Sequence, residues 1–81
     1  MIKVLVVDDH PVVRKGIVSM LETEGDIEVV GECVNGKEAI EKTKSSKPDV
    51  ILMDIVMPEL DGVQAIQAIK SYNPKEKILV L

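Results

Sequence analysis

Aromatic residues are almost absent from this chain: its 81 residues include one tyrosine and neither phenylalanine nor tryptophan. Any core must therefore be built from aliphatic side chains, within an apolar share of 46% that is ordinary for a globular domain. The single cysteine, Cys33, excludes an internal disulfide and fits a reducing, cytoplasmic setting. We expect it to be a small buried hydrophobic residue rather than a reactive thiol.

Positive charge is also in short supply. Ten Lys and Arg residues face fourteen Asp and Glu residues, which gives a net charge of −4 at pH 7. No basic cluster interrupts this acidic balance, so we expect no nucleic-acid binding by this segment itself. No apolar run approaches the length needed to span a bilayer, and the start of the chain is unlike a signal peptide. The sequence therefore predicts a cytoplasmic protein with no membrane partner.

Short apolar runs alternate with segments of helical periodicity. The runs predict strands over 3–7, 27–33, 50–53 and 77–81. Helices are predicted to begin at Pro11, after a cap at Asn35, and near Asp61. The residues expected to face the sheet are, helix by helix, Val13, Ile17, Met20 and Leu21; Ala39, Ile40 and Thr43; and Val63, Ile66 and Ile69. The order βαβαβαβ indicates one α/β domain, with a parallel sheet covered by helices on both faces.

Acidic residues follow two of the predicted strands. Asp8 and Asp9 come after the first strand, and Asp54 comes after the third, which is the most apolar and therefore central. In a doubly wound sheet of strand order 2-1-3-4, these two strands are neighbours and ligands bind at their carboxyl ends. We therefore expect the three carboxylates to converge in one crevice.

Two like charges ~4 Å apart repel by about 4 kcal/mol at an effective dielectric of 20. Converging carboxylates therefore require either that one of them takes up a proton or that a cation lies between them. Oxygen-only ligands favour a hard cation such as Mg²⁺, and a carboxylate beside that cation can attack phosphorus to form an aspartyl phosphate. The alternative is that Asp8, Asp9 and Asp54 are only turn and cap residues at strand ends.

Three stretches of this sequence resemble the receiver domains of bacterial response regulators. They are Asp8-Asp9-His10-Pro11, Asn35-Gly36 before a helix, and the more specific run from Met53-Asp54 through Met57-Pro58 to Asp61-Gly62. The resemblance spans the whole chain and implies a flavodoxin-like fold. The Asp-Asp-His-Pro opening is similar to the subgroup whose output domain is a LuxR/NarL-type DNA-binding helix-turn-helix.

The resemblance also implies residue roles within a two-component system. Asp54 would accept a phosphoryl group from a sensor histidine kinase, in a signalling module rather than a turnover enzyme. Mg²⁺ would be held by Asp9 directly, by Asp8 directly or through water, by Asp54, and by the main-chain carbonyl of Val56. A helix-start or hydrogen-bonding role is expected for His10. On the first helix, where the family docks its kinase, Arg14 and Lys15 are contact candidates with a solvated face as the default.

A complete receiver of this type continues beyond the fourth strand. It has a fifth strand and two further helices, and it places a Thr or Ser and a Lys against the phosphoryl oxygens. We therefore expect residues 1–81 to be a partial receiver domain with no output domain, truncated after the fourth strand. Phosphorylation should be impaired without those donors. The apolar edge at 78–81 should recruit a second chain.

Other functions are weighed against the same residues. A Mg²⁺-dependent phosphohydrolase with an aspartate nucleophile should have Asp-x-Asp after the first strand, whereas Asp8 and Asp9 are adjacent in this sequence. A flavodoxin-like phosphate loop should be rich in Ser, Thr and Gly, and a cobalamin module needs Gly where Val13 stands. A self-associating fragment that performs no chemistry also remains open.

Overall fold

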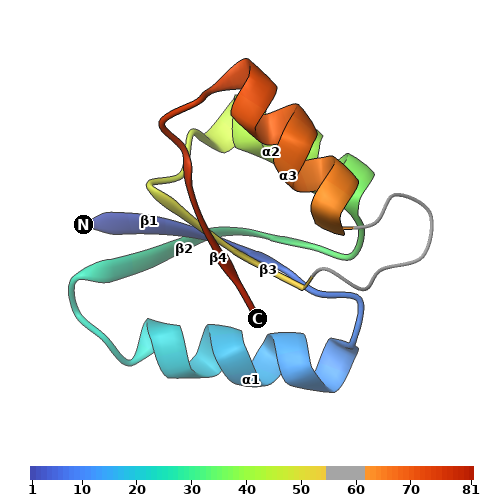
Figure 1. Cartoon of the computed structure of the whole chain (residues 1–81). Coiled ribbons are helices and arrows are strands. Elements are labelled where there is room, and N and C mark those ends of the chain that lie inside the picture. Colours follow the sequence, from blue (N-terminus) through green and yellow to red (C-terminus); the bar gives the residue numbers. More distant parts are fainter. Residues whose placement is uncertain (55–61) are drawn as a thin grey trace.

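Seven elements alternate along the chain in the computed structural model, which describes residues 1–54 and 62–81 (Figure 1). They are β1 (Ile2–Val7), α1 (Pro11–Glu22), β2 (Ile27–Cys33), α2 (Gly36–Ser46), β3 (Val50–Met53), α3 (Gly62–Tyr72) and β4 (Lys77–Val80). The predicted order of strands and helices is confirmed.

The four strands form one parallel sheet of order β2-β1-β3-β4. Helix α1 covers one face of this sheet, and α2 and α3 lie together on the other face (Figure 1). The doubly wound arrangement is therefore confirmed, with β2 at one edge and β3 in the interior. The order in which successive strands are added across the sheet reverses between β1 and β3, which are neighbours as the sequence predicts.

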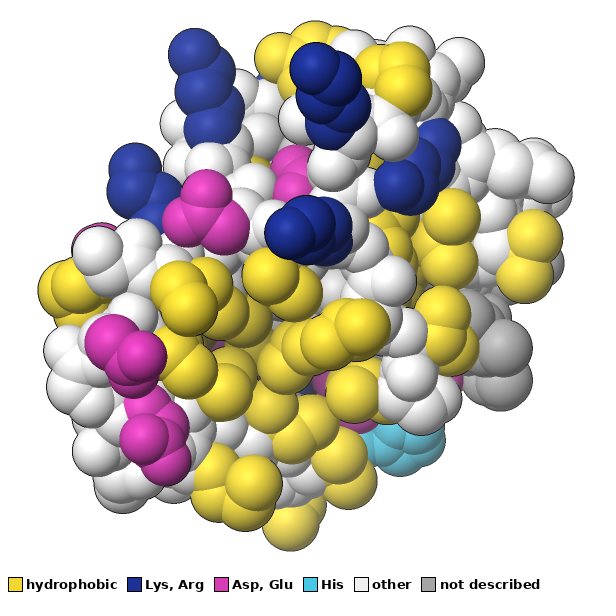
Figure 2. Space-filling view, turned by 60° about the vertical axis from the view of Figure 1, so that its left-hand side comes forward, with side chains coloured by type: hydrophobic (Ala, Val, Ile, Leu, Met, Phe, Trp, Pro, Cys, Tyr) yellow, Lys and Arg dark blue, Asp and Glu magenta, His cyan; other side chains and the backbone are white. Residues whose placement is uncertain are grey.

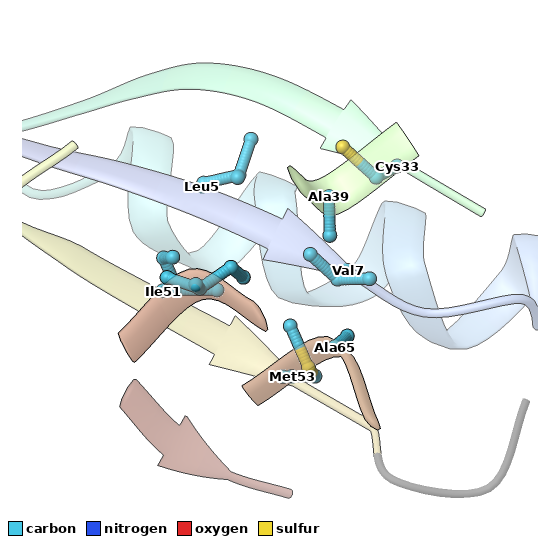
Figure 3. Packing of buried hydrophobic residues seen from close by; sticks show 8 residues of the cluster. Leu5, Val7, Cys33, Ala39, Ile51, Met53 and Ala65 are labelled. Atoms are coloured by element: carbon cyan, nitrogen blue, oxygen red, sulfur yellow. The ribbon is translucent and has the colours of Figure 1, made fainter. Parts of the chain in front are cut away.

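Strand β1 supplies two hydrophobic cores, because successive side chains on a strand point to opposite faces. Val4 and Val6 pack with Val18 of α1. Leu5 and Val7 pack on the opposite side with residues of β2, β3, α2 and α3. Figure 3 shows Cys33, Ala39, Ile51, Met53 and Ala65 in this cluster, to which Ile69 also belongs. This double burial explains why the β1 sequence is apolar without alternation.

Helix α2 begins and ends at residues with specific backbone roles. Asn35 Oδ1 accepts a hydrogen bond of 2.8 Å from the Glu38 N–H, and Glu38 Oε1 accepts one of 3.0 Å from the Val34 N–H. The predicted cap at Asn35 is thus confirmed. At the other end, Lys47 adopts a left-handed conformation with φ 48°, and Pro48 follows it.

Two predicted helix stripes are only partly right. Ile17 and Leu21 of α1, and Ile66 and Ile69 of α3, pack against the core as predicted, but the remaining members do not. In α1, Val13 and Met20 are exposed, whereas Ile17, Val18 and Leu21 face the sheet. In α3, Val63 is exposed and Ala65 is buried. Each residue turns a helix by about 100°, so an inward stripe of period i, i+3, i+4, i+7 begins at Arg14 in α1 and at Gly62 in α3.

Strand β4 forms the second edge of the sheet. Leu79, Val80 and Leu81 remain 59%, 52% and 53% exposed. Figure 2 shows hydrophobic side chains gathered across the middle of one face, below a group of Lys and Arg side chains. Among the described residues, no helix combines the length and apolar character required to cross a membrane.

Candidate functional site

The carboxyl ends of β1 and β3 bring the predicted acidic residues together. Val7 and Met53 are register partners in the parallel pairing of these strands. Just beyond them, the Asp54 N–H donates to the Val7 carbonyl over 3.0 Å, and the Asp8 N–H donates to the Cys33 carbonyl over 3.0 Å. Backbone hydrogen bonds therefore fix where both acidic segments leave the sheet.

One ligand atom each from Asp8, Asp9, His10 and Asp54 lies within 4.8 Å of the other three. We call these four residues the acidic cluster. The three carboxylates are those expected from the sequence to share a crevice, and His10 joins them. Their side chains differ in exposure, at 4% for Asp8, 26% for Asp9 and 18% for Asp54. Solvent therefore reaches Asp9 and Asp54 more readily than Asp8.

Asp8 is the most buried member of the cluster and is held by His10. Its Oδ1 accepts a hydrogen bond of 2.7 Å from the His10 backbone N–H and lies 2.8 Å from the ring Nδ1. The bond from the backbone N–H two residues further on closes a tight turn from Asp8 to His10. This turn sets the carboxylate before α1 begins.

The ring of His10 lies over the other two carboxylates as well. Nδ1 is 3.1 Å from Asp9 Oδ1 and 3.5 Å from Asp54 Oδ2, while the side chain is 62% exposed. The hydrogen bond to Asp8 and the charge of Asp9 raise the pKa of His10 above its ordinary value. His10 precedes α1 at the N-cap, yet its side chain makes no capping hydrogen bond among the described residues.

Asp9 carries an oxygen that lacks a hydrogen bond. Its Oδ1 is buried and has no hydrogen-bond partner within residues 1–54 and 62–81, although His10 Nδ1 is within ion-pair distance. A buried carboxylate oxygen left in this state is unfavourable, and a cation would satisfy it. The donor set of three carboxylates fits a hard divalent ion such as Mg²⁺.

Arg14 is a residue of this region that sequence reasoning placed on a solvated face. Its side chain is 12% exposed, Nε lies 3.1 Å from Glu32 Oε1, and a guanidinium nitrogen donates to the Asp8 carbonyl over 2.9 Å. Arg14 therefore ties α1 to the end of β2 and to the backbone of the acidic segment. Its position at the start of the inward stripe was the available signal. Lys15 is exposed, as expected.

Two other predictions concern Cys33, which the structure describes, and Val56, which it does not. Cys33 is buried, and burial raises the pKa of its thiol to about 12, so the predicted structural role holds. The expected main-chain ligand Val56, together with Met57, Pro58 and Asp61 of the motif, lies outside the described residues.

Comparisons with known proteins agree on one family. The family model described as the response regulator receiver domain matches residues 4–81. The chain is 58% identical over 80 residues to the response regulator protein VraR of Staphylococcus aureus. That match covers 99% of this chain but only 38% of VraR.

Solved structures give the same result. The signal receiver domain of the NarL response regulator from Mycobacterium tuberculosis matches with a TM-score of 0.91 and 42% identity, over 98% of this chain and 64% of that one. RcsB from Salmonella enterica serovar Typhimurium, bound to promoter rprA in the presence of the phosphomimetic BeF₃⁻, matches with a TM-score of 0.89 and 32% identity. That match covers 99% of this chain and 68% of the RcsB chain in that structure.

Proposed function

This chain belongs to the response regulator receiver domain family, and from that premise we propose that Asp54 accepts a phosphoryl group from a sensor histidine kinase. The observation that carries the proposal is the meeting of Asp8, Asp9 and Asp54 at the ends of two neighbouring strands. Among these three carboxylates, Asp54 alone follows the interior strand β3, and its 18% exposed side chain is reachable from solvent.

The reaction needs little covalent chemistry from the protein. An Asp54 carboxylate oxygen would attack the phosphorus of a phosphohistidine, forming an O–P bond while the P–N bond breaks. The imidazole nitrogen of the kinase would leave with the bonding electron pair. Catalysis is then mostly positioning and charge stabilisation. The hydrogen-bonded ends of β1 and β3 would supply the positioning.

Asp8, Asp9 and Asp54 are the residues that would hold Mg²⁺, and the Val56 carbonyl is a further proposed ligand. When bound, the ion would neutralise charge on the transferring phosphoryl group. The buried Asp9 oxygen without a hydrogen bond supports this assignment. Arg14 supports it indirectly, because it holds the Asp8 carbonyl and so limits movement of the segment that carries both carboxylates.

Phosphorylation can be tested on the chain itself. Incubation with acetyl phosphate and Mg²⁺, followed by intact-mass analysis, should show the addition of one phosphoryl group. Asp54→Asn should abolish the gain. Asp49→Asn is the matched control, because Asp49 lies at the opposite end of β3 and accepts a hydrogen bond from the Lys3 N–H. A mass gain that persists in Asp54→Asn would refute the assignment.

The alternative of a Mg²⁺-dependent phosphohydrolase makes a different prediction. A hydrolase turns over a generic phosphate ester, whereas a signalling module that stores a phosphoryl group releases little product. Steady release of nitrophenol from p-nitrophenyl phosphate, sensitive to Asp54→Asn, would favour the hydrolase. We expect at most one turnover per chain.

The output of this module is also proposed by similarity. RcsB in the matched structure is bound to a promoter. The chain spans about two fifths of the length of VraR, so the remaining length has room for an output domain. We therefore expect the phosphorylated receiver to regulate transcription through a DNA-binding segment outside residues 1–81. A cytoplasmic location is consistent with the free thiol of Cys33.

Self-association through β4 is a further proposal for the 81-residue chain. Leu79, Val80 and Leu81 are more than half exposed on an edge strand, and such edges recruit other strands. Light scattering after size-exclusion chromatography should detect dimers or larger species. Leu79→Lys should shift the chain toward monomer, and Val63→Lys, at an exposed position on α3, is the control. A wild-type monomer at high concentration would refute self-association.

A further inference from the structure

We propose that the ring of His10 competes with the divalent cation for the acidic cluster and must leave the cluster before the cation binds. This inference rests on the proposed function, because it takes Asp8, Asp9 and Asp54 as the cation ligands. It adds a role for His10 in setting how tightly the site holds its metal.

A single ring nitrogen contacts all three carboxylates. His10 Nδ1 lies 2.8 Å from Asp8 Oδ1, 3.1 Å from Asp9 Oδ1 and 3.5 Å from Asp54 Oδ2. A cation held by the same side chains needs the space in front of these oxygens, and Mg²⁺ accepts ligands only at short distances and in near-octahedral geometry. His10 Nδ1 and the cation therefore cannot occupy the space in front of these oxygens at the same time.

The ring cannot serve as a ligand in this arrangement. An ionised carboxylate only accepts hydrogen bonds, so the Nδ1 that contacts Asp8 must carry the hydrogen. A nitrogen that carries a hydrogen has no lone pair to offer a metal. The N–H instead offsets part of the carboxylate charge when no metal is present, which is the same task a cation performs.

Departure of the ring disturbs little else in the molecule. The side chain is 62% exposed and makes no capping hydrogen bond to α1 among the described residues. The Asp8 carboxylate keeps its 2.7 Å hydrogen bond from the His10 backbone when the ring turns away. Rotation about the side-chain bonds is fast for an exposed residue, so the ring shifts the binding equilibrium without acting as a slow gate.

The experiment measures Mg²⁺ affinity by isothermal titration calorimetry for the wild-type chain and for His10→Ala. Removing the competitor should lower the dissociation constant by about two- to fivefold, within the range expected for contacts of an exposed charged group. Lys15→Ala is the matched control, because it removes a positive charge from an exposed position on α1 without touching the cluster. Its affinity should stay near the wild-type value.

A second measurement needs no variant. His10 is the only histidine in the chain, so NMR gives one set of ring resonances. Saturating Mg²⁺ should move them toward the values of an exposed histidine in a peptide. Weaker Mg²⁺ binding by His10→Ala, unchanged binding, or ring resonances that ignore Mg²⁺ would each overturn the competition. Absence of Mg²⁺ binding in both proteins would overturn the proposed metal site as well, whereas equal binding overturns only the role of His10.

Discussion

Replacing Asp54 with asparagine should stabilise the metal-free protein, because it removes one of three clustered negative charges. The ligand oxygens of Asp8, Asp9 and Asp54 lie within 4.8 Å of one another. At that separation two unit charges repel by ~3.5 kcal/mol at an effective dielectric of 20 and by ~0.9 kcal/mol in bulk water. With side chains 18% to 26% exposed for Asp54 and Asp9, and with His10 nearby, we expect a gain of about 1–2 kcal/mol.

Thermal unfolding followed by circular dichroism measures this gain. In EDTA, about 1–2 kcal/mol corresponds to an increase in Tm of at least ~4 °C for a domain of this size. Mg²⁺ should reverse the order of the two proteins. It stabilises the wild-type chain by binding the folded state, while Asp54→Asn has lost a charged ligand.

Asp49→Asn is the control, because Asp49 lies at the other end of β3 and bonds the Lys3 N–H over 2.8 Å. Loss of its charge should not raise the Tm. Equal stability of Asp54→Asn and wild type in EDTA would show that the three carboxylates do not repel one another measurably. A cation would then have no charge repulsion to relieve at this site.

Three further predictions concern positions away from the acidic cluster. The Cys33 thiol, whose pKa burial raises to about 12, should resist iodoacetamide in the native chain and react at once in denaturant, followed by mass spectrometry. Burial raises the pKa of Glu76, so the ionised side chain disfavours the folded state at neutral pH. Glu76→Gln should therefore raise the free energy of unfolding, measured by urea titration at pH 7. This gain should vanish as the pH falls through the acid range, where Glu76 is protonated in both states. Lys47→Gly should stabilise the protein by about 1 kcal/mol because Lys47 has a φ of 48°, whereas Ser45→Gly within α2 should destabilise it by a similar amount. A urea titration in which Lys47→Gly lowers the free energy of unfolding would contradict this account.

Much of the fold could be predicted because the local signals agree with one another. The apolar run of β1, the start of α1 at Pro11 and the cap at Asn35 each point to the same alternation. The errors lie in helix rotation. Val13 and Val63 are apolar but face solvent, since a helix of this length tolerates an exposed valine and the sheet decides which side faces inward.

The site was predictable only to the level of its carboxylates. Strand order alone brings Asp8, Asp9 and Asp54 together at the carboxyl ends of the neighbouring strands β1 and β3. The role of His10 depends on side-chain direction, which neither spacing nor charge specifies. By its charge Arg14 resembles any surface cation, and only its helical spacing to Ile17, Val18 and Leu21 marks it as inward; its guanidinium contacts the Asp8 carbonyl and Glu32.

The pairing of β1 with β3 has a consequence for the order in which the molecule is assembled. The segments that contribute Asp8 and Asp54 are separated in the chain by α1, β2 and α2, which are synthesised between them. A nascent chain that ends before β3 can form a β1–α1–β2 unit but lacks Asp54, one of the three carboxylates of the cluster. Cation binding therefore reports that the long-range pairing has formed, and a polypeptide split between α2 and β3 should regain metal affinity only when its two pieces reassociate.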